Sequence, residues 1–323
     1  MTTRRAGERS IEGVHASPGL HWVGDGFRVA GYFSAIPGAM RRLSPFLLLD
    51  YHPPYVYSPS DRPRGVGVHP HRGFETVTLA WEGSVAHHDS TGAGGVIGPG
   101  DAQWMTAASG ILHKEYHERE WARGGGRFHM AQLWVNLPRA HKMGPPRYQG
   151  LTAAEMGRVE LADGAVRVRV IAGEHAGVRG PALTFSDVTL LDARVRAGGE
   201  LTLAVPASHN LCLLLMSGEA VIGGERASEG DLLVTRNDGD QLVVRATEDA
   251  HALVMGGAPI DEPIAAMGPF VMSTERELRE AVADYEAGRF GHLDLRRATP
   301  RDGRRGRRRA RRPRASASPS APR

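Results

Sequence analysis

Short apolar segments of four to eight residues recur along most of the chain, and many alternate apolar with polar positions. Gly, Pro, Asn or Asp residues separate them. Short alternating or β-branched segments between turn residues are typical of β-sandwiches and β-barrels. The clearest are PFLLLD, FETVTLAW, AQLWVN, RVRVIAG, LTFSDVTLLDARV, ELTLAV, LCLLLM, DLLVT and QLVVRA. The pattern predicts an all-β protein.

The two halves of the chain share one pattern. LAWEGSVAHHDS at 79–90 and LLMSGEAVIGGE at 214–225 place apolar and small residues alike, and a Gly-Asp pair follows each. Two copies of one β unit are the simplest explanation. Because the segment between them is rich in Pro, Gly and polar residues, we place a linker at 141–160. This gives an N-terminal domain at 1–140 and a C-terminal domain at 161–295.

One helix is expected near the end of the second domain, in STERELREAVADYEAGRFG. Thr274 and Glu277 fit a capping box, and Leu278, Val282 and Tyr285 share one face. The Gly that follows DYEA is the expected C-terminal cap.

Composition changes the picture mainly at the C-terminus. Residues 296–323 hold twelve Arg and one Asp, a net charge of +11, whereas the whole chain carries +4, so residues 1–295 carry about −7. The tail has no apolar periodicity and is expected to be disordered. It could bind nucleic acid through phosphates, touch an anionic surface, or be a solvated extension that reflects Arg-rich coding. We favour the last, since Arg residues vastly outnumber Lys residues throughout the chain.

Several classes of protein are disfavoured. The single cysteine, Cys212, lies in the apolar run NLCLLLM, where a buried thiol is expected rather than a nucleophile, and no disulfide framework can form. The N-terminus lacks the apolar core of a signal peptide, and no apolar run reaches the roughly 20 residues of a membrane span. We expect a soluble, cytoplasmic monomer.

Candidate chemistry lies in GVHPHRGFETVT and SGILHKEYH. In a strand, residues i and i+2 point to the same face about 6.6 Å apart, so His69 pairs with His71 and His113 with Glu115. Pro70, without an N–H, indicates an edge strand or a bulge. Facing each other in a small barrel, the two strands would bring three imidazoles and a carboxylate together. This set suits iron, and also Ni, Mn, Co or Zn, with two octahedral positions left open.

The other histidines are interpreted as surface or supporting residues, because some His-x-His pairs arise by chance among 15 histidines. They include His87, His88, His117, His129, His141, His175 and His251. The role of Glu75 is left open, since its spacing from His69 would let it face the same interior.

The two motifs also resemble known ones. Gly-x-x-x-His-x-His-x-x-x-Glu, from Gly65 to Glu75, resembles the first motif of the cupin superfamily, and Gly110-x-x-His113 the end of the second. More specifically, the pirin family is similar from about Pro45 to Gly291. The matching stretches are HPHRGFETVT, HHDSTGAGGVIGPGDAQWMTAASGILHKE, QLWVNLP and GPFVMSTERELREAVADYEAGRFG.

The resemblance implies a bicupin, with two face-to-face β-barrels of jelly-roll type, a short C-terminal helix, and a metal, typically iron, in the N-terminal barrel. The family's ligands correspond to His69, His71, His113 and Glu115, and Glu75 is not a ligand. Matching the two halves places Ala204, Pro206, Val243 and Arg245 at the ligand positions of the second barrel, which is therefore expected to be metal-free.

The resemblance also implies two functions. One is a quercetin 2,3-dioxygenase, which cleaves a flavonol with O₂ and releases carbon monoxide. Glu115 would then accept the proton of the flavonol hydroxyl, in a pocket lined by Trp104, Met105 and Ile111. The alternative is an iron-dependent regulator without enzymatic activity, which binds a transcription factor or a metabolic enzyme.

Overall fold

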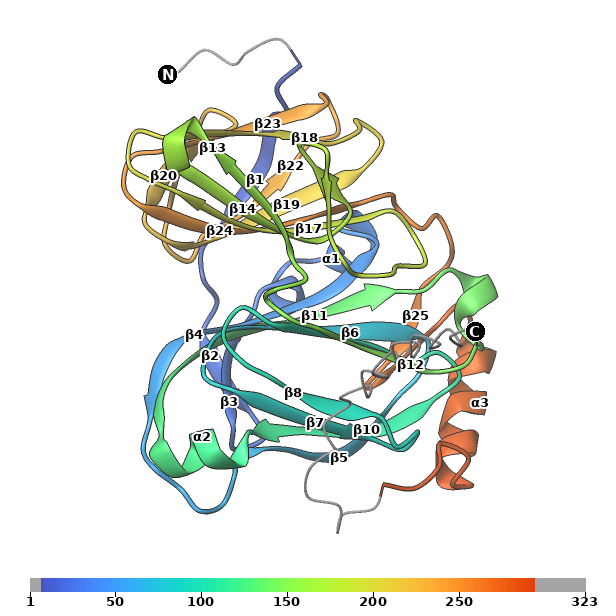
Figure 1. The fold of residues 1–323 in the computed structure, drawn as a ribbon. Helices are drawn as coiled ribbons and strands as arrows, with labels where there is room; N and C mark the ends of the chain where they lie inside the picture. Colours follow the sequence, from blue (N-terminus) through green and yellow to red (C-terminus); the bar gives the residue numbers. More distant parts are fainter. Residues whose placement is uncertain (1–6, 294–323) are drawn as a thin grey trace, which may run out of the picture.

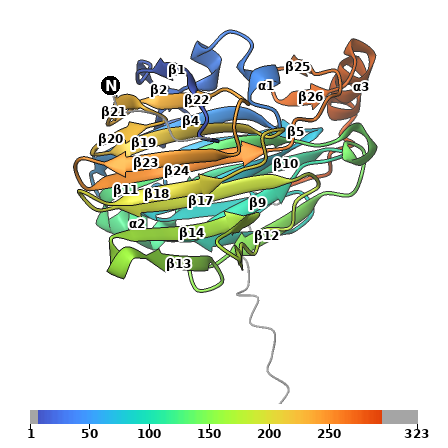
Figure 2. The same cartoon turned by 90° about the horizontal axis from the view of Figure 1, so that it is seen from above.

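Two seven-stranded antiparallel sheets lie face to face at the centre of the protein, and a four-stranded sheet completes a barrel on the outer side of each (Figure 1). The computed structural model describes residues 7–293. Figure 2 shows the strands of the second barrel lying over those of the first. The all-β bicupin fold predicted from the sequence is confirmed.

The described strands of the first barrel all lie in the N-terminal half of the chain. They are β2 (Leu20–Val23), β3 (Phe27–Gly31), β4 (Phe46–Tyr57), β5 (Gly65–His71), β6 (Phe74–Glu82), β7 (Val85–Asp89), β8 (Gly94–Ile97), β9 (Ala102–Thr106), β10 (Ile111–His117), β11 (Gly126–Asn136) and β12 (Arg147–Leu151). Their order is β12-β9-β6-β11-β4-β3-β2 in the large sheet and β5-β10-β7-β8 in the small one. Two short helices, α1 (Ala39–Arg42) and α2 (Arg119–Gly124), connect strands.

The second barrel repeats this arrangement. Its strands are β1 (Ile11–His15), β13 (Gly157–Leu161), β14 (Val166–Ala172), β17 (Val188–Val195), β18 (Glu200–Ala204), β19 (Asn210–Ser217), β20 (Glu219–Ile222), β21 (Glu225–Ser228), β22 (Leu232–Thr235), β23 (Gln241–Ala246) and β24 (Ala250–Gly257). The large sheet runs β1-β22-β19-β24-β17-β14-β13 and the small one β18-β23-β20-β21. A minor hairpin joins β15 (Glu174–His175) to β16 (Val178–Arg179).

The ends of the chain are exchanged between the barrels. β1, near the N-terminus, pairs with β22 of the second barrel. After the second barrel, β25 (Ala265–Met267), β26 (Phe270–Met272) and α3 (Glu275–Glu286) return to the side of the first, where β26 meets the end of β5. We call residues 265–291 the C-terminal arm. The capping box of Thr274 and Glu277 is confirmed at the start of α3.

Strand pairing therefore does not follow the predicted division of the chain. The N-terminal segment was assigned to the first domain, but β1 extends the second sheet. The predicted linker at 141–160 contains β12, which pairs with β9, and most of β13, which pairs with β14. This segment is rich in turn-forming residues, so its two short edge strands were not predicted. Their pairing depends on partners that are distant in the sequence rather than on the local pattern. The predicted Arg-rich tail, residues 296–323, lies outside the described residues.

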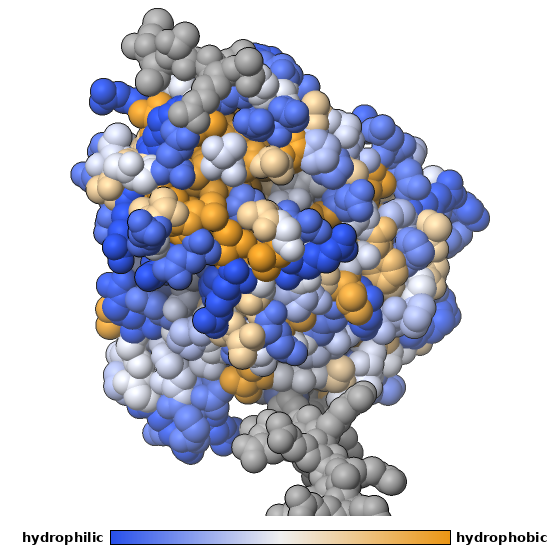
Figure 3. Space-filling view, turned by 45° about the horizontal axis from the view of Figure 1, so that its top comes forward, coloured by the Kyte–Doolittle hydropathy of each residue, from blue (hydrophilic) through white to orange (hydrophobic). Residues whose placement is uncertain are grey.

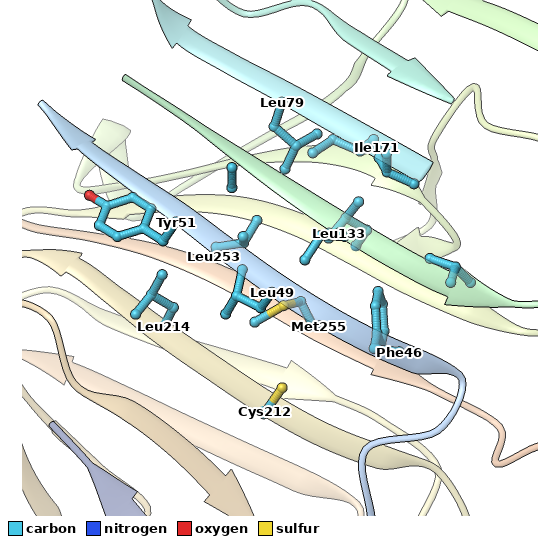
Figure 4. Packing of buried hydrophobic residues seen from close by; sticks show 14 of the residues in the cluster. Phe46, Leu49, Tyr51, Leu79, Leu133, Ile171, Cys212, Leu214, Leu253 and Met255 are labelled. Carbon is cyan, nitrogen blue, oxygen red and sulfur yellow. The ribbon is translucent and has the colours of Figure 1, made fainter. Parts of the chain in front are cut away.

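A continuous apolar core fills the space between the two large sheets (Figure 4). Leu49 and Leu133 of the first barrel face Leu214 and Leu253 of the second. Cys212 lies in this core, and burial raises the pKa of its thiol to about 12, which confirms the predicted buried thiol. The second barrel is filled with aliphatic side chains, whereas buried His, Glu, Gln and Thr residues occupy part of the first.

Polar and charged side chains cover most of the face seen in Figure 3, and apolar ones gather in one area of the upper barrel. No helix between residues 7 and 293 is long and apolar enough to cross a membrane.

Two buried histidines support one end of the first barrel. His52 contacts the Tyr57 hydroxyl (2.9 Å), and His117 Nε2 donates to the Gly26 carbonyl (2.8 Å). Burial lowers the pKa of each to about 4. Because protonation would place a charge among aromatic rings, both imidazoles are neutral at pH 7.

We expect these two histidines to lower the free energy of unfolding when the pH drops from 7 to 5. The unfolded chain binds protons near pH 6.5 and these two histidines only near pH 4, so stability is lost across that window, by up to about 2 kcal/mol for each histidine. Urea unfolding at both pH values measures the loss. A His52→Gln variant should lose less on acidification, and His292→Gln, at an exposed site, as much as the wild type. Equal losses in all three proteins would contradict this explanation.

Candidate metal centre

The four predicted ligands lie on two neighbouring strands of the first barrel. β5 carries His69 and His71, β10 carries His113 and Glu115, and His113 lies directly opposite His69. β5 is the edge strand of its sheet, as the missing N–H of Pro70 predicts. The alternation of side chains along both strands turns all four residues toward the barrel interior.

Three imidazoles converge within this group. The ligand nitrogens of His69, His71 and His113 all lie within 4.8 Å of one another, and Nε2 of His113 is 2.8 Å from Nε2 of His69. Glu115 belongs to an overlapping group, with His113 and His87, of the same dimensions. The structure thus brings the four predicted ligands together around His113, although a bulge on β5, between Val66 and His69, shifts the register opposite Lys114 of β10.

Backbone carbonyls orient two of the imidazoles. Nδ1 of His69 is 2.7 Å from the Gly67 carbonyl, and Nδ1 of His71 is 3.4 Å from the Pro269 carbonyl. A carbonyl only accepts, so each Nδ1 carries the proton and each Nε2 keeps a free lone pair. Burial, and then the neighbouring His69, lowers the pKa of His71 to about 3. Neutral imidazoles with free Nε2 atoms are what a transition metal requires.

Glu115 is held by three donors that the sequence analysis did not identify. Thr78 Oγ1 donates to Oε1 (3.1 Å), Gln103 Nε2 also donates to Oε1, and Gln132 Nε2 donates to Oε2 (2.5 Å). These residues come from β6, β9 and β11, whose inward faces meet β10 across the barrel. The carboxylate is buried and oriented from both oxygens.

Glu75 does not join the metal site. It pairs with Thr106 across the sheet and accepts a hydrogen bond from its hydroxyl (2.6 Å), on the face that turns toward the second barrel. Burial raises its pKa to about 7. The bend at Gly73, where φ is +89°, separates β5 from β6 and interrupts the alternation of side chains. Glu75 therefore does not face the same side as His69, although the two have the same parity in the sequence.

The predicted pocket lining needs one correction. Trp104 lies in the core between the barrels and not beside the imidazoles, because it alternates with Gln103, which points to Glu115. Met105 and Ile111 share a small apolar cluster and have the parity of the site residues. Trp104 and Met105 are neighbours on β9, so they face opposite sides of the strand and only Met105 can face the site.

The register predicted for the second barrel is also shifted by one residue. Ala204 and Pro206 are exposed. The inward positions are Leu201 and Leu203 on β18, with Leu242 and Val244 opposite them on β23. These side chains hold no atom that binds a metal. That this barrel is metal-free stays a prediction.

The C-terminal arm reaches the site from outside the barrel. Arg72, next to His71, is paired with Asp284 of α3 at 2.8 Å. Pro269, whose carbonyl faces His71, belongs to the same arm. The end of the chain thus helps to orient a predicted ligand near its beginning, which no local sequence pattern indicates.

Comparisons with known proteins find one family along most of the chain. The model of the pirin family matches residues 26–135, and that of the pirin C-terminal cupin domain matches residues 190–291. A Pseudomonas aeruginosa protein, whose name provisionally assigns it quercetin 2,3-dioxygenase activity, is 48% identical over 282 residues, which cover 87% of this chain and 98% of the relative. Pirin of Rattus norvegicus is 37% identical, over 78% of this chain and 84% of its own.

One solved structure has a similar fold. The crystal structure of a quercetin 2,3-dioxygenase from Acinetobacter baumannii is 43% identical in sequence and superposes with a TM-score of 0.85. The match covers 88% of this chain and 99% of that one.

Proposed function

The chain belongs to the pirin family, and from this premise we propose that it is a metal-dependent dioxygenase that acts on flavonols, of the quercetin 2,3-dioxygenase type. We propose iron as its metal, held by His69, His71, His113 and Glu115; Ni, Mn, Co or Zn would suit the same ligands. The observation that carries this proposal is the convergence of three imidazole nitrogens within 4.8 Å, next to a buried carboxylate.

The names of two relatives support the substrate class. The Pseudomonas aeruginosa and Acinetobacter baumannii proteins, at 48% and 43% identity, both bear the name quercetin 2,3-dioxygenase, provisionally in the first case. Each match spans nearly the whole relative, so the site and its surroundings are included.

When bound, the metal lowers the pKa of a hydroxyl group that coordinates it. Glu115 would accept the proton of the flavonol hydroxyl, and Thr78, Gln103 and Gln132 hold its two oxygens in place. His69 is partly exposed, whereas His71 and His113 are buried, so the approach from solvent lies on the side of His69. Apolar Met105 and Ile111 limit the access of water.

Incubation of the iron-loaded protein with quercetin in air tests the proposal. Loss of the visible absorbance of quercetin is expected, and a Glu115→Gln variant should lose about 10²-fold or more of the rate per bound iron. Glu75→Gln is the matched control, because this glutamate lies on the opposite face of the barrel wall and should leave that rate nearly unchanged.

No turnover above that of a His113→Ala variant would contradict the enzymatic function. That result would favour the other function implied by the family. This function is an iron-dependent regulator that binds a transcription factor or a metabolic enzyme.

A further inference from the structure

We propose that His87 and Asp89 are positioning residues for the metal centre: they fix the tautomer of His113 that turns Nε2 toward the metal, and so raise the affinity of the site. This inference rests on the proposed metal site. Both residues lie on β7, which pairs with β10, so that Asp89 is opposite His113 and His87 is opposite Glu115.

His113 differs from the other two imidazoles in what faces its Nδ1 atom. His69 and His71 each have a backbone carbonyl there, at Gly67 and Pro269. Nδ1 of His113 instead lies 3.3 Å from Nδ1 of His87. A carbonyl can only accept, but a neutral imidazole nitrogen accepts or donates according to its own tautomer. The state of His113 therefore depends on that of His87.

Asp89 determines the tautomer of His87. Its Oδ2 atom is 3.3 Å from Nε2 of His87, and a carboxylate accepts hydrogen bonds without donating them. His87 thus carries its proton on Nε2 and offers the lone pair of Nδ1 to His113. In turn, Nδ1 of His113 carries a proton, and its Nε2 is free beside Nε2 of His69. The opposite tautomer of His87 would set two N–H groups against each other.

The pair is held rigidly. Oδ1 of Asp89 accepts hydrogen bonds from the Thr91 hydroxyl (2.6 Å), the Thr91 amide (2.9 Å) and the Ala93 amide (3.2 Å). The ring of His87 stacks on Tyr148 with centroids 5.1 Å apart and planes 17° apart. His87 is fully buried and Asp89 nearly so, so bulk solvent does not compete with either contact.

A direct role for His87 as a ligand fits the arrangement less well. His87, His113 and Glu115 also have ligand atoms within 4.8 Å of one another. An ion between His87 and His113 would use Nδ1 of His113, however, and would forgo the nitrogens of His69 and His71 that converge on Nε2. A single ion gathers three imidazoles only on the Nε2 side.

Zinc binding to the metal-free protein tests the proposal without any use of activity, with Zn²⁺ alone as the probe and a chelating dye as the competitor. In Asp89→Asn, the three donors on Oδ1 keep the amide oxygen there, so the amide NH₂ faces His87 and reverses its tautomer. The dissociation constant of Zn²⁺ should rise 10- to 100-fold. His87→Phe, which preserves the stacking on Tyr148, should show a similar rise.

His88→Gln is the matched control. His88 lies between the two residues on the opposite face of β7, where it contacts Tyr116, and its replacement should change the dissociation constant less than about 3-fold. In the zinc-loaded wild type, nitrogen-15 NMR should find the proton of His113 on Nδ1. Thermal unfolding of each metal-free variant verifies that it is folded.

Unchanged zinc affinity in both folded variants would overturn this inference alone, as would NMR evidence that zinc binds a nitrogen of His87. A wild-type chain that binds no zinc would overturn the metal site and this inference with it. Absence of quercetin turnover would contradict the proposed reaction and leave the result on His87 and Asp89 standing.

Discussion

The double variant His69→Ala, His71→Ala should purify without a bound transition metal, whereas the wild type should carry about one equivalent per chain. Loss of one supporting partner of a ligand costs roughly 10- to 100-fold in metal affinity, and this variant loses two of the four proposed ligands themselves. The two remaining side chains, His113 and Glu115, are too few to retain an ion through purification.

Elemental analysis of the purified proteins measures this difference. The variant should still fold, because β5 is an edge strand and the main cores are formed by other residues. His292→Ala, at an exposed site outside the barrel, is the control and should retain its metal. Equal metal content in the double variant and the wild type would show that the ligands lie elsewhere.

Asp192→Asn should cost about 3–5 kcal/mol in the free energy of unfolding, the cost of breaking a buried ion pair. Asp192 of β17 is buried where the two barrels meet. It accepts hydrogen bonds from Trp81 Nε1 of the first barrel (3.1 Å), from His251 Nε2 (2.5 Å) and from Arg169 Nε (2.7 Å). Arg169 also donates to the Gly100 carbonyl of the first barrel. The carboxylate therefore joins both barrels.

The charge of Asp192 is essential to this arrangement. Burial alone would raise its pKa, but hydrogen bonds and charge from His251 and Arg169 outweigh burial and hold the pKa well below its usual value. The folded pKa is lower than the unfolded one, about 3.9, so the contribution is complete at neutral pH and is lost as the pH falls below that value.

Denaturant unfolding at pH 7 tests this prediction. Asp261→Asn, at an exposed position, should change the free energy of unfolding by less than about 0.5 kcal/mol. A loss under 1 kcal/mol in Asp192→Asn would mean that the contacts of this carboxylate are replaced by water.

The four proposed ligands could be predicted as a group from the sequence because their geometry is local. In an extended strand, residues i and i+2 share a face whatever the rest of the fold does, so the pairs on β5 and β10 followed from parity. The same argument left Glu75 open, since the bend at Gly73 breaks the alternation between neighbouring strands. Odd or even spacing predicts which side chains share a face within one strand, but not across a turn.

Residues whose roles depend on pairing between strands were not predictable in this way. His87 is one of several buried histidines, and only the alignment of β7 with β10 distinguishes it. Thr78, Gln103 and Gln132 have no motif of their own, although each lies on a strand with the inward alternation that the fold implies. The C-terminal arm could be predicted as a helix, but its position beside β5 depends on contacts that cross the whole chain.

The exchange of chain ends between the barrels affects the order in which this protein can form on a ribosome. At about 5–20 residues per second, roughly 7–30 s separate the completion of β11 from the emergence of the arm. During that interval the nascent first barrel lacks the Pro269 carbonyl that faces His71, and β1 awaits its partner β22. The two halves are therefore not independent modules, and a cut between them would leave each without a piece carried by the other.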